Sequence, residues 1–325
     1  MSPSDAPPVA AASLTSTMTS VLMVGQVARD LVLEVDALPE AGGSASVRTY
    51  QEVLGGKGAN QAVALRQLGG TAGPRVALLG VAGDDEDGDR ILAQARLDGV
   101  DVGGVVRRGG TALLVDVVEP GGRRRLLEHV PPEVLLTRAD VQDAAAAGLF
   151  DVDWVSVQLQ QPVAAVLAAV ELARQRGARV LVDGAAEEST RDHLLAAADV
   201  VRADARESAT WVDGRGEGRG EGPDGVLRCA EELQAAGPSV VALAVPGWGD
   251  VVCWSGGHRL LPYGDDTVVD PTGAGDAFVA GLLVSLAAGE SAADAAGVAA
   301  ASAAATVGRP GGRPSLTPEV VGSNG

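Results

Sequence analysis

The residues best suited to chemistry in this sequence lie between Asp270 and Gly281, in the run DPTGAGDAFVAG. Gly273 and Gly275 stand directly before the apolar residues of a predicted helix. The first amides of a helix have no partner inside it, and together with the helix dipole they can bind an anion such as a phosphoryl group. Asp276 would lie in the first turn, where its ionised carboxylate could accept a proton from a hydroxyl. An aspartate that only caps or charges a helix start fits the same residues.

A second glycine-rich run, GGKGANQAVALRQLG from Gly55 to Gly69, also leads into a predicted helix, over residues 57–69. Lys57 and Asn60 would lie near the N-terminal end of that helix. The run is not a P-loop, because glycine rather than serine or threonine follows Lys57. Close packing of a helix on a sheet would also explain these glycines, but two such runs in one chain are far more specific than either alone.

The two runs resemble the two sequence motifs of the ribokinase, or PfkB, family of carbohydrate kinases, and the resemblance covers nearly the whole chain. It implies an α/β fold, a ribokinase-like three-layer sandwich with a mainly parallel central sheet and a small β lid. It also implies an ATP-dependent kinase that phosphorylates a primary hydroxyl of a sugar, with ribose as the leading candidate. Asp276 would be the general base, and the turn of Gly273, Ala274 and Gly275 would stabilise charge on the phosphoryl group. The implied sugar site consists of Asp30, Gly55, Gly56, Lys57, Asn60 and Gln160.

Two departures from the family pattern bear on the sugar. Ala28 replaces an asparagine near Asp30, and Gln160 replaces a glutamate that binds sugar hydroxyls in ribokinases. Fewer hydroxyl contacts alter the choice of sugar, so a fructose-type sugar or a nucleoside is the enzyme alternative. A nucleoside kinase would need aromatic groups near the lid, and only 2% of the residues are aromatic.

The resemblance places ATP binding at Asp204, Glu207, Gly247, Gly249 and Gly275. Asp204 and Glu207 follow a predicted strand at helical spacing, so they could instead be solvated carboxylates at a helix start. Asp204 replaces the family's asparagine, and Ala244 and Pro246 replace the usual residues of the phosphate loop. Glu207 would act through water on an ATP-bound magnesium ion, since Mg²⁺ prefers oxygen ligands and keeps several waters. These departures also motivate a second hypothesis, a sugar- or nucleotide-binding protein with weakened catalysis.

The resemblance also implies a monovalent cation, K⁺, and a homodimer formed through the lid. The cation would be bound, mostly by backbone oxygens, by Asp270, Thr272, Thr306, Arg309, Gly311 and Ser315.

Composition limits the class of partner. The chain has 325 residues, 46% of them apolar, and its 25 basic and 43 acidic residues give a formal charge of −18. This charge would repel nucleic acid and anionic membrane surfaces, and no apolar stretch is long enough to span a membrane. Cys229 and Cys253 show no metal-ligand spacing, which favours a reducing compartment, and we expect a cytoplasmic protein that binds a sugar and ATP.

Apolar runs at 76–81, 152–157, 178–182, 198–201 and 239–245 alternate with helical stretches, which is typical of a parallel sheet covered on both faces. Ligands in such sheets bind beyond the carboxyl ends of the strands, where Gln160, Asp183 and Asp204 fall. We also predict two strands, one within residues 21–27 and one within residues 31–35, with Asp30 at the turn between them. The basic run Arg123 to Arg125 lies on a predicted hairpin, where it forms either a solvated edge or a contact to an anionic group. The predicted organisation is a disordered tail (1–20), an α/β kinase domain (21–36, 51–110 and 130–325), a lid (37–50 and 111–129) and a flexible loop (213–225).

Overall fold

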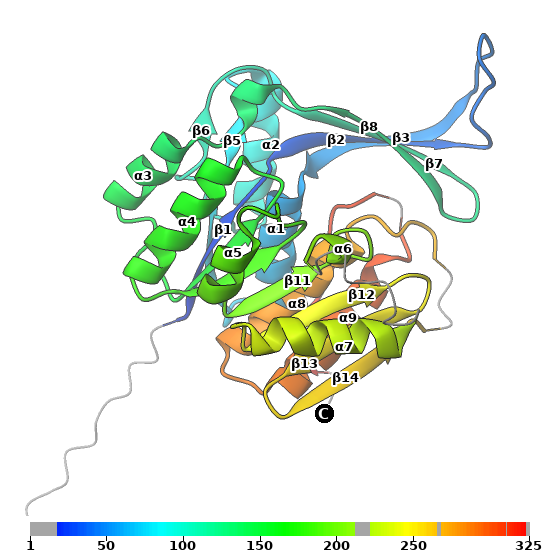
Figure 1. The fold of residues 1–325 in the computed structure, drawn as a ribbon. Coiled ribbons are helices and arrows are strands. Elements are labelled where there is room, and N and C mark those ends of the chain that lie inside the picture. The colour runs from blue at the N-terminus through cyan, green and yellow to red at the C-terminus, as the bar shows by residue number, and fades with distance from the viewer. Residues whose placement is uncertain (1–17, 212–221, 265–267, 310, 323–325) are drawn as a thin grey trace, which may run out of the picture.

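The computed structural model describes residues 18–211, 222–264, 268–309 and 311–322. Strands and helices alternate along most of this length (Figure 1). The strands are β1 (Ser20–Val24), β2 (Ala28–Val35), β3 (Val47–Gly55), β4 (Arg75–Leu79), β5 (Val81–Ala82), β6 (Val106–Arg107), β7 (Leu113–Glu119), β8 (Arg123–His129), β9 (Trp154–Gln158), β10 (Arg179–Asp183), β11 (Val200–Ala203), β12 (Val240–Val245), β13 (Gly249–Trp254) and β14 (Gly257–Pro262). The helices are α1 (Lys57–Gly69), α2 (Glu86–Leu97), the 3₁₀ helix η1 (Pro132–Val134), α3 (Arg138–Ala146), α4 (Val163–Gln175), α5 (Arg191–Ala197), α6 (Ser208–Trp211), α7 (Pro223–Ala235), α8 (Ala274–Ala287), α9 (Ala292–Thr306) and α10 (Glu319–Gly322).

The larger sheet has the strand order β14-β13-β12-β11-β10-β9-β1-β4. Its strands from β12 to β4 pair in parallel, and β13 and β14 add an antiparallel edge. All six residues of β12 are apolar and buried, as expected for a strand covered on both faces. Each of the five apolar runs singled out in the sequence contributes a strand to this sheet, which confirms the predicted mainly parallel sheet.

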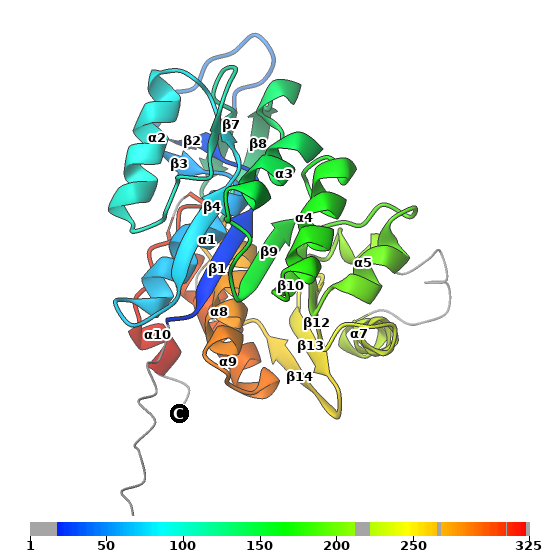
Figure 2. The same cartoon turned by 90° about the vertical axis from the view of Figure 1, so that its left-hand side faces the viewer.

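Helices cover both faces of this sheet (Figures 1 and 2). Successive residues of β1 point to opposite sides, so that Val21 and Met23 join a core with α1, α8 and α9, while Leu22 and Val24 join a second core with α3, α4, α5 and α7. The sheet therefore lies between two helical layers, and the predicted three-layer sandwich is confirmed.

A smaller sheet, with the order β3-β2-β7-β8, projects from the main body and is called the lid here (Figure 1). It includes β2, which pairs with β3 and β7, although the sequence analysis assigned residues 28–35 to the α/β domain. The alternating burial of β2 is typical of a strand with one covered face rather than of a central strand. The prediction that Asp30 lies at a turn is also wrong, because Asp30 is the third residue of β2 and the chain turns at residues 25–27.

The predicted tail and flexible loop lie mostly outside the described residues. Within them, Ser20 already belongs to β1, and residues 223–225 form the first turn of α7. The prediction of a loop reaching residue 225 is wrong there, because Pro223 stands at the first position of the helix, where its fixed φ suits helical geometry.

Candidate active site

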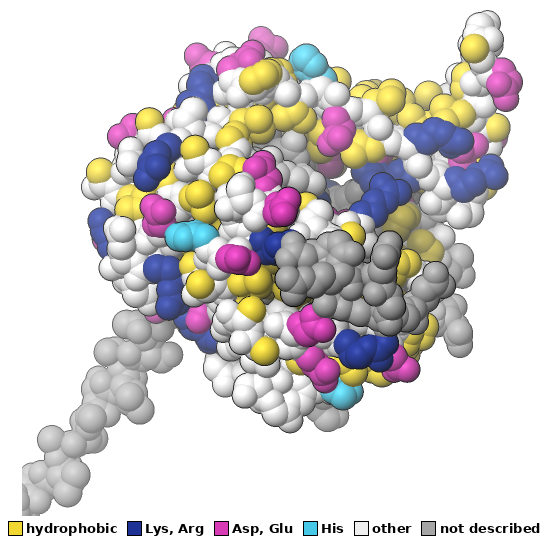
Figure 3. Space-filling model, viewed as in Figure 1, with side chains coloured by type: hydrophobic (Ala, Val, Ile, Leu, Met, Phe, Trp, Pro, Cys, Tyr) yellow, Lys and Arg dark blue, Asp and Glu magenta, His cyan; other side chains and the backbone are white. Residues whose placement is uncertain are grey.

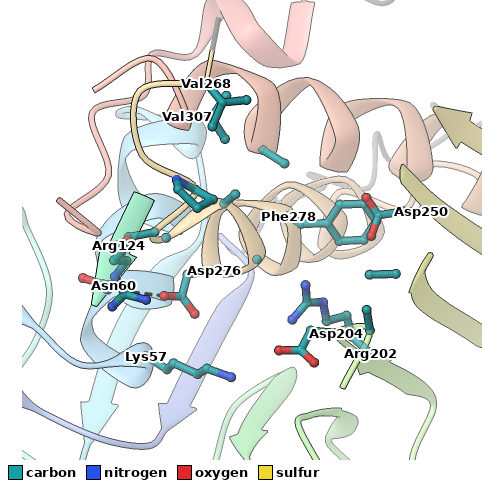
Figure 4. A pocket seen from close by; sticks show the side chains of 18 of the residues that line it. Lys57, Asn60, Arg124, Arg202, Asp204, Asp250, Val268, Asp276, Phe278 and Val307 are labelled. Carbon is teal, nitrogen blue, oxygen red and sulfur yellow. Dashed lines mark hydrogen bonds between the residues drawn. The ribbon is translucent and has the colours of Figure 1, made fainter. Parts of the chain in front are cut away.

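A cavity of about 740 Å³ lies between the lid and the carboxyl ends of the parallel strands (Figure 4). At one end it is lined by side chains of β2, the lid and α1, and at the other end by residues of β13, β14 and α9. We call these the acceptor end and the nucleotide end, after the ligands that the sequence resemblance predicts for them. The N-terminus of α8 lies between them, with Gly273, Ala274, Gly275 and Asp276 in the wall.

The turn before α8 depends on glycine. Gly273 is the N-cap of the helix and has a φ of 77°, a conformation that costs little only for glycine. A Cβ atom on Gly273 would lie 2.3 Å from the carbonyl oxygen of Gly312. Among the described residues no side chain caps the helix, and although the amide of Ala274 donates to the carbonyl of Pro271 over 3.3 Å, the amides of Gly275 and Asp276 remain available to a ligand in the cavity. The arrangement fits the predicted anion site.

Asp276 is the third residue of α8, and only 7% of its surface is exposed. Asn60 Nδ2 and Gln61 Nε2, both from α1, donate to its two carboxylate oxygens over 3.3 and 3.2 Å. Burial raises the pKa of Asp276 to about 6, with nearby Lys57 opposing this shift. The carboxylate is therefore oriented and ionised at neutral pH, and its raised pKa makes it a stronger base than an exposed aspartate.

Asp276 is linked through Gln61 to a buried ion pair of Asp183 and Arg202. Gln61 Nε2 also donates to Asp183 Oδ2 over 2.8 Å, and Arg202 Nη1 donates to Asp183 Oδ1 over 3.1 Å. Asp183 is fully buried at the end of β10. The strand pattern located Asp183, but Gln61 and Arg202 were not predicted as site residues. The GGKGANQ run contained the signal for Gln61, and for Arg202 the only signal was its place at the end of a strand.

Asp30 is buried at the acceptor end with 3% of its surface exposed, and its Oδ1 atom makes no hydrogen bond within the described part of the chain. A Cβ atom on Gly55 would lie 1.9 Å from the Asp30 carboxylate, so glycine is required beside it. Burial and, to a smaller extent, the nearby carboxylate of Asp116 together raise the pKa of Asp30 to about 7, with Arg124 opposing this shift. Gly56, with a φ of 86°, and Gln160 also line this end.

The lid arginines have separate roles. Arg124 lines the cavity and forms an ion pair with the buried Asp116, whereas Arg123 and Arg125 both contact Glu119. Figure 3 shows dark-blue basic side chains over the lid on this face of the molecule. The sequence allowed either a solvated edge or a contact to an anionic group for this basic run. Arg124 is positioned for a contact to a ligand in the cavity.

Lys57 lines the cavity, and its Nζ atom lies 2.8 Å from Glu207 Oε1. Asp204 Oδ1 accepts hydrogen bonds from the amides of Arg206 and Glu207, and Glu207 Oε2 accepts one from the amide of Asp204. These reciprocal bonds are those of a helix start, the simpler of the two alternatives for the pair. Asp204 Oδ2 accepts no hydrogen bond from the described residues, and Asp204 lines the cavity.

The nucleotide end is mostly apolar. It is lined by Ala244, Asp250, Leu261, Pro262, Tyr263, Val268, Phe278, Ala300, Ala303, Ala304 and Val307. Gly247 and Gly249, predicted to hold the nucleotide phosphates, are not among the residues that line the cavity. Gly249 allows close strand pairing instead, since a Cβ atom there would lie 2.0 Å from the carbonyl oxygen of Leu261.

The residues of the predicted K⁺ site come together only in part. Asp270 is fully buried and accepts hydrogen bonds from the amides of Thr272 and Gly311 over 2.9 and 2.8 Å. The hydroxyl of Thr306 donates within α9, to the carbonyl of Ser302, and the Arg309 guanidinium contacts the Ser315 hydroxyl. Asp270 thus joins the loop before α8 to the loop after α9.

Comparison with known proteins identifies the family. Residues 18–319 match the pfkB family of carbohydrate kinases. The chain belongs to this family. The kinase is 34% identical over 280 residues to an ATP-dependent ribose-1-phosphate kinase from Halopiger xanaduensis, covering 82% of this chain and 85% of that protein. It is 28% identical to a bifunctional ribokinase/ribose-5-phosphate isomerase A from Fructilactobacillus sanfranciscensis over 83% of this chain, but spans only 49% of that relative.

Solved structures share the fold of the kinase. Ribokinase from Giardia lamblia matches with a TM-score of 0.77 at 22% identity, over 94% of this chain and 98% of that one. Ribokinase from Thermotoga maritima matches with a TM-score of 0.74 at 22% identity, over 94% and 99% of the two chains. The kinase is thus a ribokinase-like carbohydrate kinase in sequence family and in fold.

The kinase has a carboxylate suited to magnesium, although among the described residues no group of three or more His, Cys, Asp or Glu side chains could hold a metal ion by itself. Mg²⁺ bound to ATP needs only one or two protein carboxylates, since waters and phosphates supply the other ligands. Asp204 fits this requirement, because it lines the cavity and its Oδ2 atom accepts no hydrogen bond from the described residues. Glu207 does not line the cavity, and its two carboxylate oxygens already bind Lys57 and the amide of Asp204. In the described ranges, no helix is long and apolar enough to cross a membrane.

Proposed function

We propose that this carbohydrate kinase transfers the γ-phosphoryl group of ATP to a primary hydroxyl of a sugar, with ribose as the leading candidate. The observation that carries the proposal is the position of Asp276. Its buried carboxylate is held by Asn60 and Gln61 beside the uncapped N-terminus of α8. A base and an anion site within one helical turn are what transfer of a phosphoryl group to an alcohol requires.

In the proposed reaction the sugar hydroxyl lies against Asp276 and gives its proton to the carboxylate as its oxygen attacks the γ-phosphorus. The bond between the γ-phosphorus and the β,γ-bridging oxygen breaks, and ADP leaves with that electron pair. The amides of Gly275 and Asp276, in the turn that begins at Gly273, donate to the phosphoryl oxygens while negative charge moves across them. Magnesium, when bound with ATP, neutralises phosphate charge, and Asp204 would hold it through water.

The sugar itself is proposed from the acceptor end. Asp30 lines the cavity, and its buried Oδ1 atom has no hydrogen-bond donor among the described residues, so its carboxylate suits a hydroxyl donor of a sugar. Gln160 lines the same end with a neutral amide, and Ala28 is fully buried without a polar group. The similar kinase from Halopiger xanaduensis is named for ribose-1-phosphate, so this phosphorylated sugar belongs among the candidate acceptors. Arg124 and Lys57 are the cationic side chains of the described acceptor end that could meet such a phosphate.

The remaining parts of the proposal are a K⁺ ion near Asp270, a homodimer and a cytoplasmic location. Tyr50 and Leu127 support the dimer, because they are 68% and 64% exposed on the lid and would be covered by a second lid. Both cysteines are free thiols, in keeping with a reducing compartment.

An ATP-consumption screen tests the proposal. Purified protein with Mg²⁺ is offered ribose, other pentoses, fructose, ribose-1-phosphate and nucleosides, each with K⁺ and with Na⁺ in its place. We expect ribose or ribose-1-phosphate to give the largest kcat/KM, with higher turnover in K⁺. Saturable sugar binding without turnover of any acceptor would instead support the second hypothesis, a binding protein with weakened catalysis.

A further inference from the structure

Arg202 is a buried cation in contact with the anion site. It lies at the end of β11, and only 6% of its surface is exposed. A Cβ atom built on Gly275 would lie 2.7 Å from Nη2 and 3.0 Å from Nη1 of Arg202. The guanidinium therefore rests directly against the backbone at the second position of α8, and Figure 4 shows it below the first turn of that helix.

The hydrogen bonds of Arg202 are incomplete. Nη1 donates to Asp183 Oδ1 over 3.1 Å, but Nε is buried and makes no hydrogen bond within the described residues. The guanidinium has five N–H donors, and a buried donor without a partner is costly. On its other side the guanidinium lies 6.0 Å from the centre of the Phe278 ring. Arg202 also lines the cavity, so a ligand bound there could supply an acceptor to the outer nitrogens of the guanidinium.

The surroundings keep Arg202 charged. Burial by itself would lower its pKa, but the carboxylates of Asp183, Asp250 and Glu207 outweigh this and raise the pKa above its ordinary value. Asp183 accepts one hydrogen bond from Arg202, and the other carboxylates act at longer range. A guanidinium held in this way is a preorganised positive charge in a site of low dielectric, where an anion gains most from it.

We propose that Arg202 is a further catalytic residue that donates directly to an oxygen of the transferred γ-phosphoryl group. This inference rests on the proposed kinase function. The phosphoryl group at the tip of α8 would receive backbone amides on one side and the guanidinium of Arg202 on the other. Charge-assisted hydrogen bonds of this kind strengthen as charge develops on the phosphoryl oxygens, while proton transfer remains with Asp276.

A purely structural role for Arg202 makes different predictions. If Arg202 only neutralised Asp183, replacing both residues by neutral ones would restore what the loss of Arg202 alone removes. The decisive variants are Arg202→Met, Arg202→Lys, Asp183→Asn and the double variant of Arg202→Met with Asp183→Asn. Arg179→Met is the matched control, because Arg179 is half-exposed at the opposite end of β10 and stacks on Trp154.

The experiment measures kcat with the best acceptor, and calorimetric affinities for ADP and for the non-hydrolysable ATP analogue AMP-PNP. We expect Arg202→Met to lower kcat about 10²- to 10³-fold. We expect it to lower the affinity for AMP-PNP about tenfold or more and the affinity for ADP about threefold at most, because only AMP-PNP carries a phosphoryl group in the γ position. Arg202→Lys should recover part of both losses, the double variant should recover neither, and Arg179→Met should resemble the parent protein.

Full recovery in the double variant, or equal losses of AMP-PNP and ADP affinity, would overturn the assignment. If Arg202→Met does not fold, Arg202→Lys and the double variant decide, since each leaves no uncompensated buried carboxylate. A parent protein that phosphorylates no acceptor would defeat the proposed function instead, and the AMP-PNP comparison would still test Arg202. The two failures are therefore distinct.

Discussion

The two ends of the cavity are built in different ways. At the acceptor end, Asp30, Asp116 and Arg124 are charged side chains that constrain one another, and Asp30 fits only because residue 55 is glycine. At the nucleotide end, apolar side chains form most of the wall, and Ala300 and Ala303 of α9 are among them. From this difference we expect the first end to select its ligand by hydrogen bonds, for which a mismatch is costly, and the second to select by shape, for which a mismatch costs less.

The catalytic centre belongs to neither end alone. Asp276 comes from α8, which faces the nucleotide end, but its hydrogen-bond donors Asn60 and Gln61 come from α1, which faces the acceptor end. Variants at this centre should therefore affect turnover, and variants at either end should affect one substrate. The predictions that follow test this separation.

The largest effect is expected at Asp276. Asp276→Asn keeps the size and the burial of the side chain but removes the base, so kcat should fall about 10²- to 10⁴-fold. The affinities for ATP and for the acceptor should change little, because both ends are intact. Steady-state kinetics and calorimetry check both statements, and Asp143→Asn on the exposed face of α3 is the matched control. Parent-like turnover in Asp276→Asn would remove the assigned base.

A single added methyl group at residue 55 should impair binding of the acceptor. Gly55→Ala places a Cβ atom where the carboxylate of Asp30 now lies, so Asp30 must move and its hydrogen bond to the acceptor is lost. We expect kcat/KM for the acceptor to fall about tenfold to 10²-fold, with the KM for ATP nearly unchanged. The comparison would fail if both KM values rose together. Gly110→Ala is the matched control, because neither Gly55 nor Gly110 has a positive φ and a Cβ atom on Gly110 would meet only Asp85 Oδ2, at 3.9 Å.

Acid pH should lower the kcat, because it protonates Asp276. The pKa of Asp276 is raised by burial to about 6, and only the ionised carboxylate can accept the proton. The kcat should be constant above pH 7 and fall below about pH 6, reaching about a tenth of its plateau near pH 5. A pH–rate profile measures this, and the residual activity of Asp276→Asn should show no such fall. If the same fall of kcat at acid pH persisted in Asp276→Asn, a group other than Asp276 would be responsible for it.

How far the sequence could predict this molecule differs between its parts. The parallel sheet was predictable, because strands buried on both faces leave continuous apolar runs such as Val240–Val245. The tip of α8 was also predictable, since glycine, a change to helical spacing and a carboxylate adjoin in sequence. Features carried by neighbouring residues are thus visible in the sequence.

Contacts made by residues far apart in sequence were not predictable. Asp116 and Arg124 meet through the pairing of β7 with β8, and Arg202 meets Gly275 only after β11 and α8 are packed. Asp30 was misplaced because a strand with one covered face resembles a turn flanked by two short strands. The charges that tune the cavity depend on burial, and burial is set by the whole fold rather than by a local pattern.

A larger side chain at the nucleotide end should weaken ATP binding without changing the binding of the acceptor. Ala303→Leu adds three carbon atoms to the wall formed by α9, so the KM for ATP should rise about three- to tenfold. The KM for the acceptor and the pH profile should stay as in the parent protein. Ala147→Leu at the end of α3, where the side chain is exposed, is a matched control. A larger effect on the acceptor than on ATP would show that the two ends are coupled.

The smallest effect, on stability rather than activity, concerns the charge buried at the acceptor end. The pKa of Asp30 in the folded protein is about 7, raised by burial and then by Asp116 from an ordinary value of 3.8. The cost of burying this carboxyl group therefore builds up as the pH rises from the ordinary pKa of 3.8 to about 7 and stays constant above that. It is absent below the ordinary pKa, where both the folded and the unfolded states are protonated. Asp30→Asn should thus raise the free energy of unfolding of the ligand-free protein by about 1–3 kcal/mol at pH 8, and by less than half as much at pH 5. Denaturant unfolding at the two pH values measures the difference, and a variant no more stable than the parent at pH 8 would mean that Arg124 already compensates the buried charge.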